Sequence, residues 1–165
     1  MPNKKKHITV AFTGHRTYSG EAAESLAEAL RELYSEGYRI FLCGMAWGFD
    51  LAAAEAVVAL QSEYDDVELV AVVPHATFGD MFWGEQKRLY DFVLSKAQSS
   101  VVLGQQEGDL AYIRRNDYLV DNASYVLAWW DGRPTGGTAY TVAKARREHL
   151  PVRNLYPQLQ MELFK

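Results

Sequence analysis

The stretch SYVLAWWDGRPTGGTAYTVAKARREH, residues 124–149, contains the features that decide the fold. Its apolar run, SYVLAWW, is short and continuous, which is typical of a strand covered on both faces of a parallel sheet. The glycine-containing loop that follows leads into residues 138–149, where a helix is expected. A strand, a turn and a helix in this order form one β-α unit, and parallel sheets are built from such units.

The same unit recurs about five times along the chain. Apolar runs predict strands at residues 7–13, 38–44, 67–74, 99–104 and 124–130, and a last strand or extended segment at 151–156. Helical spacing predicts helices at residues 21–36, 51–64, 110–123 and 138–149. A further helix is expected to carry Leu89, Phe92 and Val93 on one face, and Ser19 or Gly20 is expected to cap the first helix.

This order predicts a single α/β domain over residues 1–165. The domain is a doubly wound Rossmann-like fold with a mostly parallel sheet of five or more strands. Residues 1–6 are expected to form a basic tail, and residues 156–165 a C-terminal tail.

Composition and charge indicate a globular protein and disfavour a nucleic-acid binder or a membrane-spanning protein. Hydrophobic residues make up 48% of the chain and charged residues 23%, as in ordinary globular proteins. The formal net charge is −4 and the pI about 5.6, whereas non-specific nucleic-acid binders are usually basic, so nucleic acid is not the expected partner. The chain has neither a signal-type apolar segment nor an apolar run of the roughly 18 residues that cross a membrane. One cysteine, Cys43, excludes an internal disulfide, and we expect a cytoplasmic protein.

Ligands of such a sheet bind beyond the carboxyl ends of the strands, near the switch in strand order. Five segments lie there: TGHR, GMAWGFD, PHATF, GQQEGD and DGRPTGGT. The first, second and fifth carry glycine just before a helix, which suits phosphate because glycine permits close backbone approach and a helix N-terminus offers unpaired N–H groups. A single turn of this kind is more often structural, but three at one edge would face a single cleft.

The polar and aromatic side chains of these segments allow two interpretations each. Arg16 either binds phosphate through its planar guanidinium or is a surface residue. His15 either contacts a ligand or caps the next helix. Asp50 is expected first as the N-cap of its helix, and Trp47 either stacks on a base or covers the cleft.

The helix expected at residues 110–123 brings Arg114, Arg115 and Asn116 near the ligand edge, although a solvated helix face explains them equally well. Other chemistries are disfavoured by missing motifs. The four histidines lack the spacing of metal ligands, so no metal is expected. G-x-S-x-G, G-x-G-x-x-G and the P-loop are all absent, which excludes the corresponding hydrolase, dinucleotide and nucleotide signatures.

TGHR, GMAWGFD, RRNDYLVDNASYVLAWWDG and GGTAYTVAKA together resemble the YpsA-type branch of the SLOG superfamily, over roughly residues 8–155. That superfamily also contains the LOG phosphoribohydrolases, which activate cytokinins, and the DNA-processing protein DprA/Smf. The resemblance implies a Rossmann-like fold with a cleft for nucleotides or nucleotide-derived ligands. The ligand-binding candidates, to which Trp47 and Asp131 are added from their position, are Thr13, Gly14, His15, Arg16, Gly44, Gly48, Asp50, Arg115, Asn116, Gly136, Gly137 and Thr138.

The chain departs from two of these relatives at chemically important positions. The LOG stretch PGGxGTxxE has its catalytic Glu where this chain has Thr141, and threonine does not stabilise an oxocarbenium-like centre. The catalytic residue is therefore unknown, with Asp131, Glu85 and Asp50 as candidate carboxylates. Trp47 stands where the DprA loop GxARGID has arginine, which removes a phosphate-binding charge.

The leading hypothesis is a protein that binds a nucleoside phosphate or an ADP-ribose-like molecule, as a sensor or regulator, and that requires no cofactor. The alternative is an enzyme that cleaves an N-glycosidic bond of a nucleotide. A DNA-binding module like DprA, specific for single strands, is the third. Homodimers are common for such folds, so self-association is a further expectation.

Overall fold

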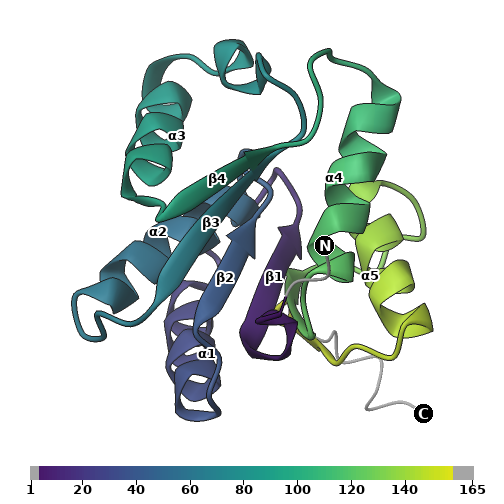
Figure 1. Ribbon diagram of the computed structural model, residues 1–165. Coiled ribbons are helices and arrows are strands. Elements are labelled where there is room, and N and C mark those ends of the chain that lie inside the picture. The colour runs from purple at the N-terminus through teal and green to yellow at the C-terminus, as the bar shows by residue number, and fades with distance from the viewer. Residues whose placement is uncertain (1–3, 158–165) are drawn as a thin grey trace.

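The computed structural model describes residues 4–157, in which six parallel strands form one sheet between two layers of helices (Figure 1). The strands are β1 (Thr9–Gly14), β2 (Ile40–Cys43), β3 (Glu68–Val73), β4 (Ser99–Val102), β5 (Tyr125–Trp129) and β6 (Val152–Asn154). The α-helices are α1 (Ala23–Ser35), α2 (Phe49–Gln61), α3 (Gly84–Lys96), α4 (Asp109–Asp121) and α5 (Gly137–Arg147). Two short 3-10 helices are η1 (Lys6–Ile8) and η2 (Phe78–Met81).

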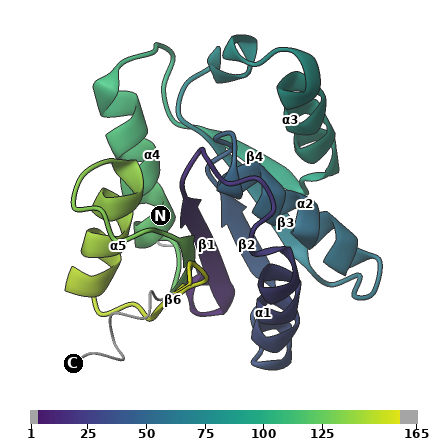
Figure 2. The ribbon, with the colours of Figure 1, turned by 180° about the vertical axis from the view of Figure 1, so that it is seen from behind.

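The order of the strands is β4-β3-β2-β1-β5-β6. The chain builds outward from β1 to β4 with α1, α2 and α3 packed together on one face. It then returns through α4 to β5, and α4 packs with α5 on the opposite face (Figure 2). The strand order therefore switches between β1 and β5, where Gly14 lies in register with Trp129. This confirms the predicted doubly wound Rossmann-like fold.

The continuous apolar runs have a simple cause in this layering. Successive side chains of β1 point to opposite faces of the sheet, and both faces are covered by helices. Val10 and Phe12 join the core beneath α1 and α2, where Phe12 stacks on Phe41 with ring centroids 5.9 Å apart. Ala11 joins a second cluster, which includes Leu119 of α4.

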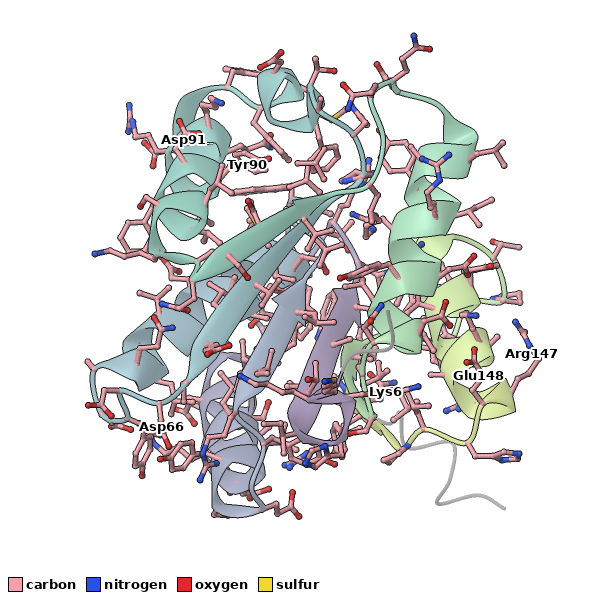
Figure 3. The ribbon with its side chains drawn as sticks, viewed as in Figure 1. Lys6, Asp66, Tyr90, Asp91, Arg147 and Glu148 are labelled. Carbon is pink, nitrogen blue, oxygen red and sulfur yellow. The ribbon has the colours of Figure 1, made fainter. Side chains whose placement is uncertain are left out.

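Some local predictions need correction. The first helix has Ala22 as its N-cap with no capping side chain, because Ser19 donates instead to the Glu21 carboxylate. In α3, Phe92 is 41% exposed and Tyr90 takes the buried position, pointing inward while Asp91 points away from the sheet (Figure 3). Strand β4 is largely exposed because it is an edge strand.

The two expected tails fall partly outside the described residues, namely at 1–3 and 158–165. Lys6 belongs to η1 rather than to a loose tail, and the Lys5 carbonyl accepts hydrogen bonds from Ile8 and Thr9. Tyr156 packs on Trp129, with ring centroids 4.9 Å apart. Within residues 4–157, every helix is too short or too polar to cross a membrane.

Candidate functional site

A polar cavity of about 520 Å³ opens beyond the carboxyl ends of β1 and β5, at the switch in strand order. The turn after β1, the start of α2, the middle of α4 and the turn before α5 all reach it. The predicted residues that line it are Thr13, Gly14, His15, Arg16, Asp50, Arg115, Asn116, Gly136, Gly137 and Thr138. The three glycine turns thus meet at one cavity, although the first and the last of them lie more than 120 residues apart in the sequence.

Two glycines hold the first two turns together. Gly48 has φ +92°, and a Cβ atom there would lie 2.6 Å from the Arg16 Cα and the His15 carbonyl oxygen. The amide of Phe49 donates to the same carbonyl of His15 at 3.2 Å. A Cβ atom at Gly14 would lie 2.5 Å from Phe49. Only glycine permits this approach, so both positions are required to bring the two turns together at the cavity.

Arg115 is the buried cation of the cavity. Only 6% of it is exposed, its Nη1 donates to the Gly44 carbonyl at 2.6 Å, and its Nε donates to Asn116 Oδ1 at 2.8 Å. Among the described side chains, which exclude that of Asp109, and the backbone of residues 4–157, no group forms a hydrogen bond with Nη2. A Cβ atom at Gly44 would lie 2.8 Å from the Arg115 side chain, so glycine is required there as well. The solvated helix face considered for Arg115 and Asn116 is therefore wrong.

Asp50 is not the N-cap of α2. Gly48 is the N-cap, and Asp50 lies buried in the first turn, where its carboxylate accepts from the Ala46 amide at 3.3 Å. Burial raises the pKa of Asp50 to about 6, although the Arg115 guanidinium and the Ala46 amide oppose that rise. Burial likewise lowers the pKa of Arg115, and the Asp50 carboxylate opposes this. The two side chains are thus buried groups of opposite charge, coupled electrostatically in the wall of the cavity.

The raised pKa of Asp50 predicts a specific pH dependence of stability. Because the folded protein holds this proton more tightly than the unfolded chain, where the pKa is about 3.9, the stabilising contribution is complete only below about pH 3 and is lost as pH rises through 6. The free energy of unfolding of the wild type, minus that of Asp50→Asn, should fall by roughly 2 kcal/mol between pH 4 and pH 7. Urea unfolding across this range measures it.

Asp66→Asn is the control for this titration. The hydrogen bond from Tyr34 lowers the pKa of Asp66, so its contribution has the opposite sign and is lost as pH falls. A wild-type to Asp50→Asn difference that stays constant from pH 4 to pH 7 would contradict the assignment.

The N-terminus of α5 forms the opposite wall. Gly136 is its N-cap with φ +100°, and no side chain caps the helix. The first-turn amides and the positive end of the helix dipole are thus available to an anion. A Cβ atom at Gly137 would meet only Asn116 Nδ2, at an ordinary contact distance of 3.5 Å.

At the rim, Asp131 binds both His15 and Arg133. His15 Nε2 lies 3.0 Å from the Asp131 amide and 3.1 Å from its Oδ1, so it accepts from the amide when unprotonated and donates to the carboxylate when protonated. Hydrogen bonds from Arg133 hold the pKa of the Asp131 carboxyl well below its usual range. His15 therefore ties the turn after β1 to the turn after β5, and it does not cap α1.

Several predicted residues lie away from the polar cavity. Glu85 is exposed on α3 and pairs with Arg88, so it is not a carboxylate of this site. Thr141 is fully buried and donates to the Gly137 carbonyl at 3.0 Å, which leaves its hydroxyl satisfied inside the helix. Trp47 lines a second, apolar pocket beside the cavity.

Sequence reasoning missed three contributions to the site. Arg133 and Thr135 line the polar cavity from the turn before α5, and Tyr112 lines it from α4. The pocket beside it is built largely from the loop after β3, including Phe78 and Phe82. The aromatic content of HATFGDMFWGE, at the ligand edge of the sheet, is the signal that would have found it.

The sheet is doubly wound and parallel, and three glycine turns and a buried arginine meet at its switch point. These features define a Rossmann-like domain with a cleft at that point. The sequence model described as the YspA SLOG family matches residues 10–163. The chain belongs to this family, and the resemblance seen in its motifs is confirmed.

Individual relatives agree with this placement. A UPF0398 protein of Bacillus cereus (strain G9842) is 22% identical over 152 residues, which are 84% of this chain and 83% of that protein. The structure of DNA processing protein A (DprA) from Streptococcus pneumoniae is 25% identical with a TM-score of 0.64, covering 90% of this chain and 50% of that one. DNA processing protein A from Helicobacter pylori is 19% identical, with a TM-score of 0.65 and coverage of 93% and 67%. The chain thus spans half the length of the Streptococcus protein.

Proposed function

We propose that the chain binds a nucleoside phosphate or a nucleotide derivative such as ADP-ribose. The phosphate would lie between the N-terminus of α5 and the guanidinium of Arg115. The observation that carries this proposal is the burial of Arg115 in the wall of a polar cavity, where Nη2 has no hydrogen-bond partner among the described groups of the chain. A buried cation is costly unless an anion compensates it. Asp50 is the buried carboxyl that interacts with Arg115, and burial disfavours its charged form.

The surroundings of Arg115 suit the same ligand. The first turn of α5 offers free amides, and Arg16 stands exposed at the mouth without an ion pair to any residue in the described range. A guanidinium binds two phosphate oxygens with its planar fork. The cavity volume of 520 Å³ falls within the range of about 300–1,000 Å³ that small-molecule sites occupy.

Gly137→Asp is expected to abolish binding without unfolding the protein. A carboxylate in the first turn of α5 is favourable to the helix dipole, and the site has room for a side chain, but the charge occupies and repels the phosphate position. Calorimetry with AMP, ADP-ribose and NAD should show saturable binding of at least one ligand. Its affinity should fall about a hundredfold or more in the variant, because a charge-assisted contact becomes repulsive.

Gly137→Asn is the matched control, because it has the same shape without the charge. It should bind more weakly than the wild type and more strongly than Gly137→Asp, with the same melting temperature as the wild type. Absence of saturable binding by all three ligands would reject the proposal.

Asp50 favours a second candidate function, hydrolysis of a nucleotide N-glycosidic bond. Its carboxyl lines the cavity, and a pKa of about 6 suits a group that exchanges protons near neutral pH. Release of free base from AMP, lost in Asp50→Asn, would support this activity. Intact AMP after long incubation with a binding-competent protein would reject it.

Single-stranded DNA, which the Helicobacter pylori relative binds, is the least favoured ligand. The formal net charge of −4 and the presence of Trp47 in the turn before α2 both weaken attraction to a phosphate backbone. A mobility shift of single-stranded DNA by the protein at low salt would be required to support this ligand.

A further inference from the structure

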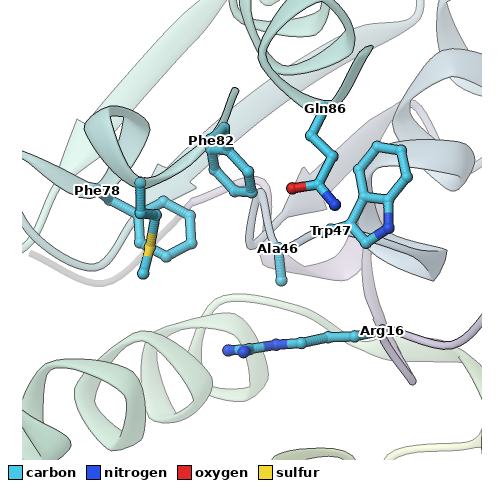
Figure 4. A pocket seen from close by; sticks show the side chains of 7 residues that line it. Arg16, Ala46, Trp47, Phe78, Phe82 and Gln86 are labelled. Carbon is cyan, nitrogen blue, oxygen red and sulfur yellow. The ribbon is translucent and has the colours of Figure 1, made fainter. Parts of the chain in front are cut away.

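A second pocket, of about 230 Å³, adjoins the polar cavity and differs from it in chemistry. Arg16 and Ala46 line both cavities and form the boundary between them. The remaining lining comes from Trp47, Phe78, Met81, Phe82 and Gln86 (Figure 4). The pocket is therefore mainly aromatic and apolar, with one cation and one amide.

Its size indicates a subsite rather than a separate site. Small-molecule sites span about 300–1,000 Å³, so a volume of 230 Å³ holds one ring system rather than a whole nucleotide. The shared wall at Arg16 means that a ligand with its phosphate in the polar cavity can extend an uncharged group past this side chain.

The aromatic wall is rigid. Phe78 and Phe82 are both buried and pack edge to face, with centroids 5.3 Å apart, and Phe82 stacks on Tyr90 at 4.8 Å. Trp47 is only half-buried, on the side of the pocket next to Gln86 (Figure 4). Aromatic faces and guanidinium planes are the groups on which proteins stack nucleobases.

Gln86 supplies the polar contact that a base requires. Its amide turns toward the pocket in Figure 4, and no hydrogen bond joins it to the backbone of residues 4–157 or to their described side chains, which exclude that of Asp109. An amide offers one acceptor and two donors, which match the ring nitrogen and the exocyclic amine of adenine. An amide with its polar atoms available beside an aromatic wall is the arrangement expected of a subsite for a nucleobase.

We propose that this pocket is the base subsite of the ligand and that it prefers adenine to guanine; the inference rests on the proposed phosphate site. One amide satisfies one donor–acceptor pair. Guanine brings a carbonyl, a ring N–H and an amine into the same apolar surroundings and leaves more polar groups unpaired than adenine does.

Calorimetry on the full chain with AMP, GMP and ribose 5-phosphate tests this subsite, because ribose 5-phosphate keeps the phosphate and lacks the base. AMP should bind about tenfold more tightly than either of the other two. Gln86→Leu should remove the preference for AMP over GMP and leave the affinity for ribose 5-phosphate unchanged. Gln106→Leu, in the exposed loop before α4, is the matched control and should behave as the wild type.

The outcomes separate the two proposals. Equal affinity for AMP and ribose 5-phosphate would overturn the base subsite while leaving the phosphate site intact. Gln86→Leu weakening ribose 5-phosphate as much as AMP would also overturn it, because Gln86 would then act through the phosphate site. Failure of all three ligands to bind would reject the proposed function itself and the subsite with it.

Discussion

Replacing Gly48 with alanine is expected to lower the free energy of unfolding by about 2–4 kcal/mol. The new Cβ atom would strain a backbone at φ +92° and would lie 2.6 Å from the Arg16 Cα and the His15 carbonyl oxygen. Backbone atoms cannot rotate aside as a flexible side chain can, so the turn after β1 must move. That movement displaces Arg16 from the boundary of both cavities, and ligand affinity should fall together with stability.

Gly20→Ala is the matched control for this prediction. Gly20 has a similar φ of +103°, but a Cβ atom there meets nothing within 4 Å. The free energy of unfolding of this variant should fall only by the cost of the strained backbone, about 1 kcal/mol. Urea unfolding of Gly48→Ala and Gly20→Ala separates the cost of backbone strain from the cost of the clash between the two turns. Equal losses would contradict the role given to Gly48.

The second large effect is expected at Arg115. Arg115→Met should lower the free energy of unfolding by about 3–5 kcal/mol at pH 7, because it removes the cation that contributes most to stabilising the buried Asp50 carboxylate. It also removes the donors to the Gly44 carbonyl and to Asn116 Oδ1. The loss should shrink toward pH 5, since Asp50 is then protonated and no longer needs the cation.

A double-mutant cycle with Asp50→Asn checks that cause. At pH 7, the double variant Arg115→Met, Asp50→Asn should lose less free energy of unfolding than the two single variants lose in sum. Arg88→Met, which breaks an exposed pair with Glu85, is the control and should cost less than about 1 kcal/mol. Strict additivity of the Arg115 and Asp50 losses would show that the two side chains do not compensate each other.

The fold was predictable because each buried strand is covered on two faces. Val10, Ala11 and Phe12 are all buried, so their stretch of sequence is apolar without alternation. The same reasoning fails for edge strand β4, where Ser100 and Val102 are exposed. Strand order could be inferred only as doubly wound, since pairing of β1 with β5 depends on contacts far apart in the sequence.

The candidate site was predictable in its turns and not in its side-chain roles. Glycines before helices marked the turns that meet at the cavity. The role of Asp50 was misassigned because α2 begins at Phe49, so the helix is capped at Gly48 and the carboxylate turns back to Ala46. A shift of two residues in a helix start decides whether a carboxylate caps a helix or is buried beside a cation. Motif position alone does not resolve this.

The aromatic loop after β3 is a signal for the pocket containing Phe78 and Phe82, but the residues that close this pocket were not predictable. Its wall joins the loop after β3 to the turn before α2 and to Arg16 after β1, and no local spacing encodes that meeting. Glu85 was a candidate carboxylate from the same stretch of sequence, but it begins α3 directly after that loop and projects into solvent.

A crystal structure of the chain with AMP tests the central claim most directly. We predict phosphate oxygens within hydrogen-bond distance of the Gly137 and Thr138 amides and of the Arg115 guanidinium. A phosphate bound at another edge of the sheet, with the N-terminus of α5 left in contact with solvent alone, would contradict the account.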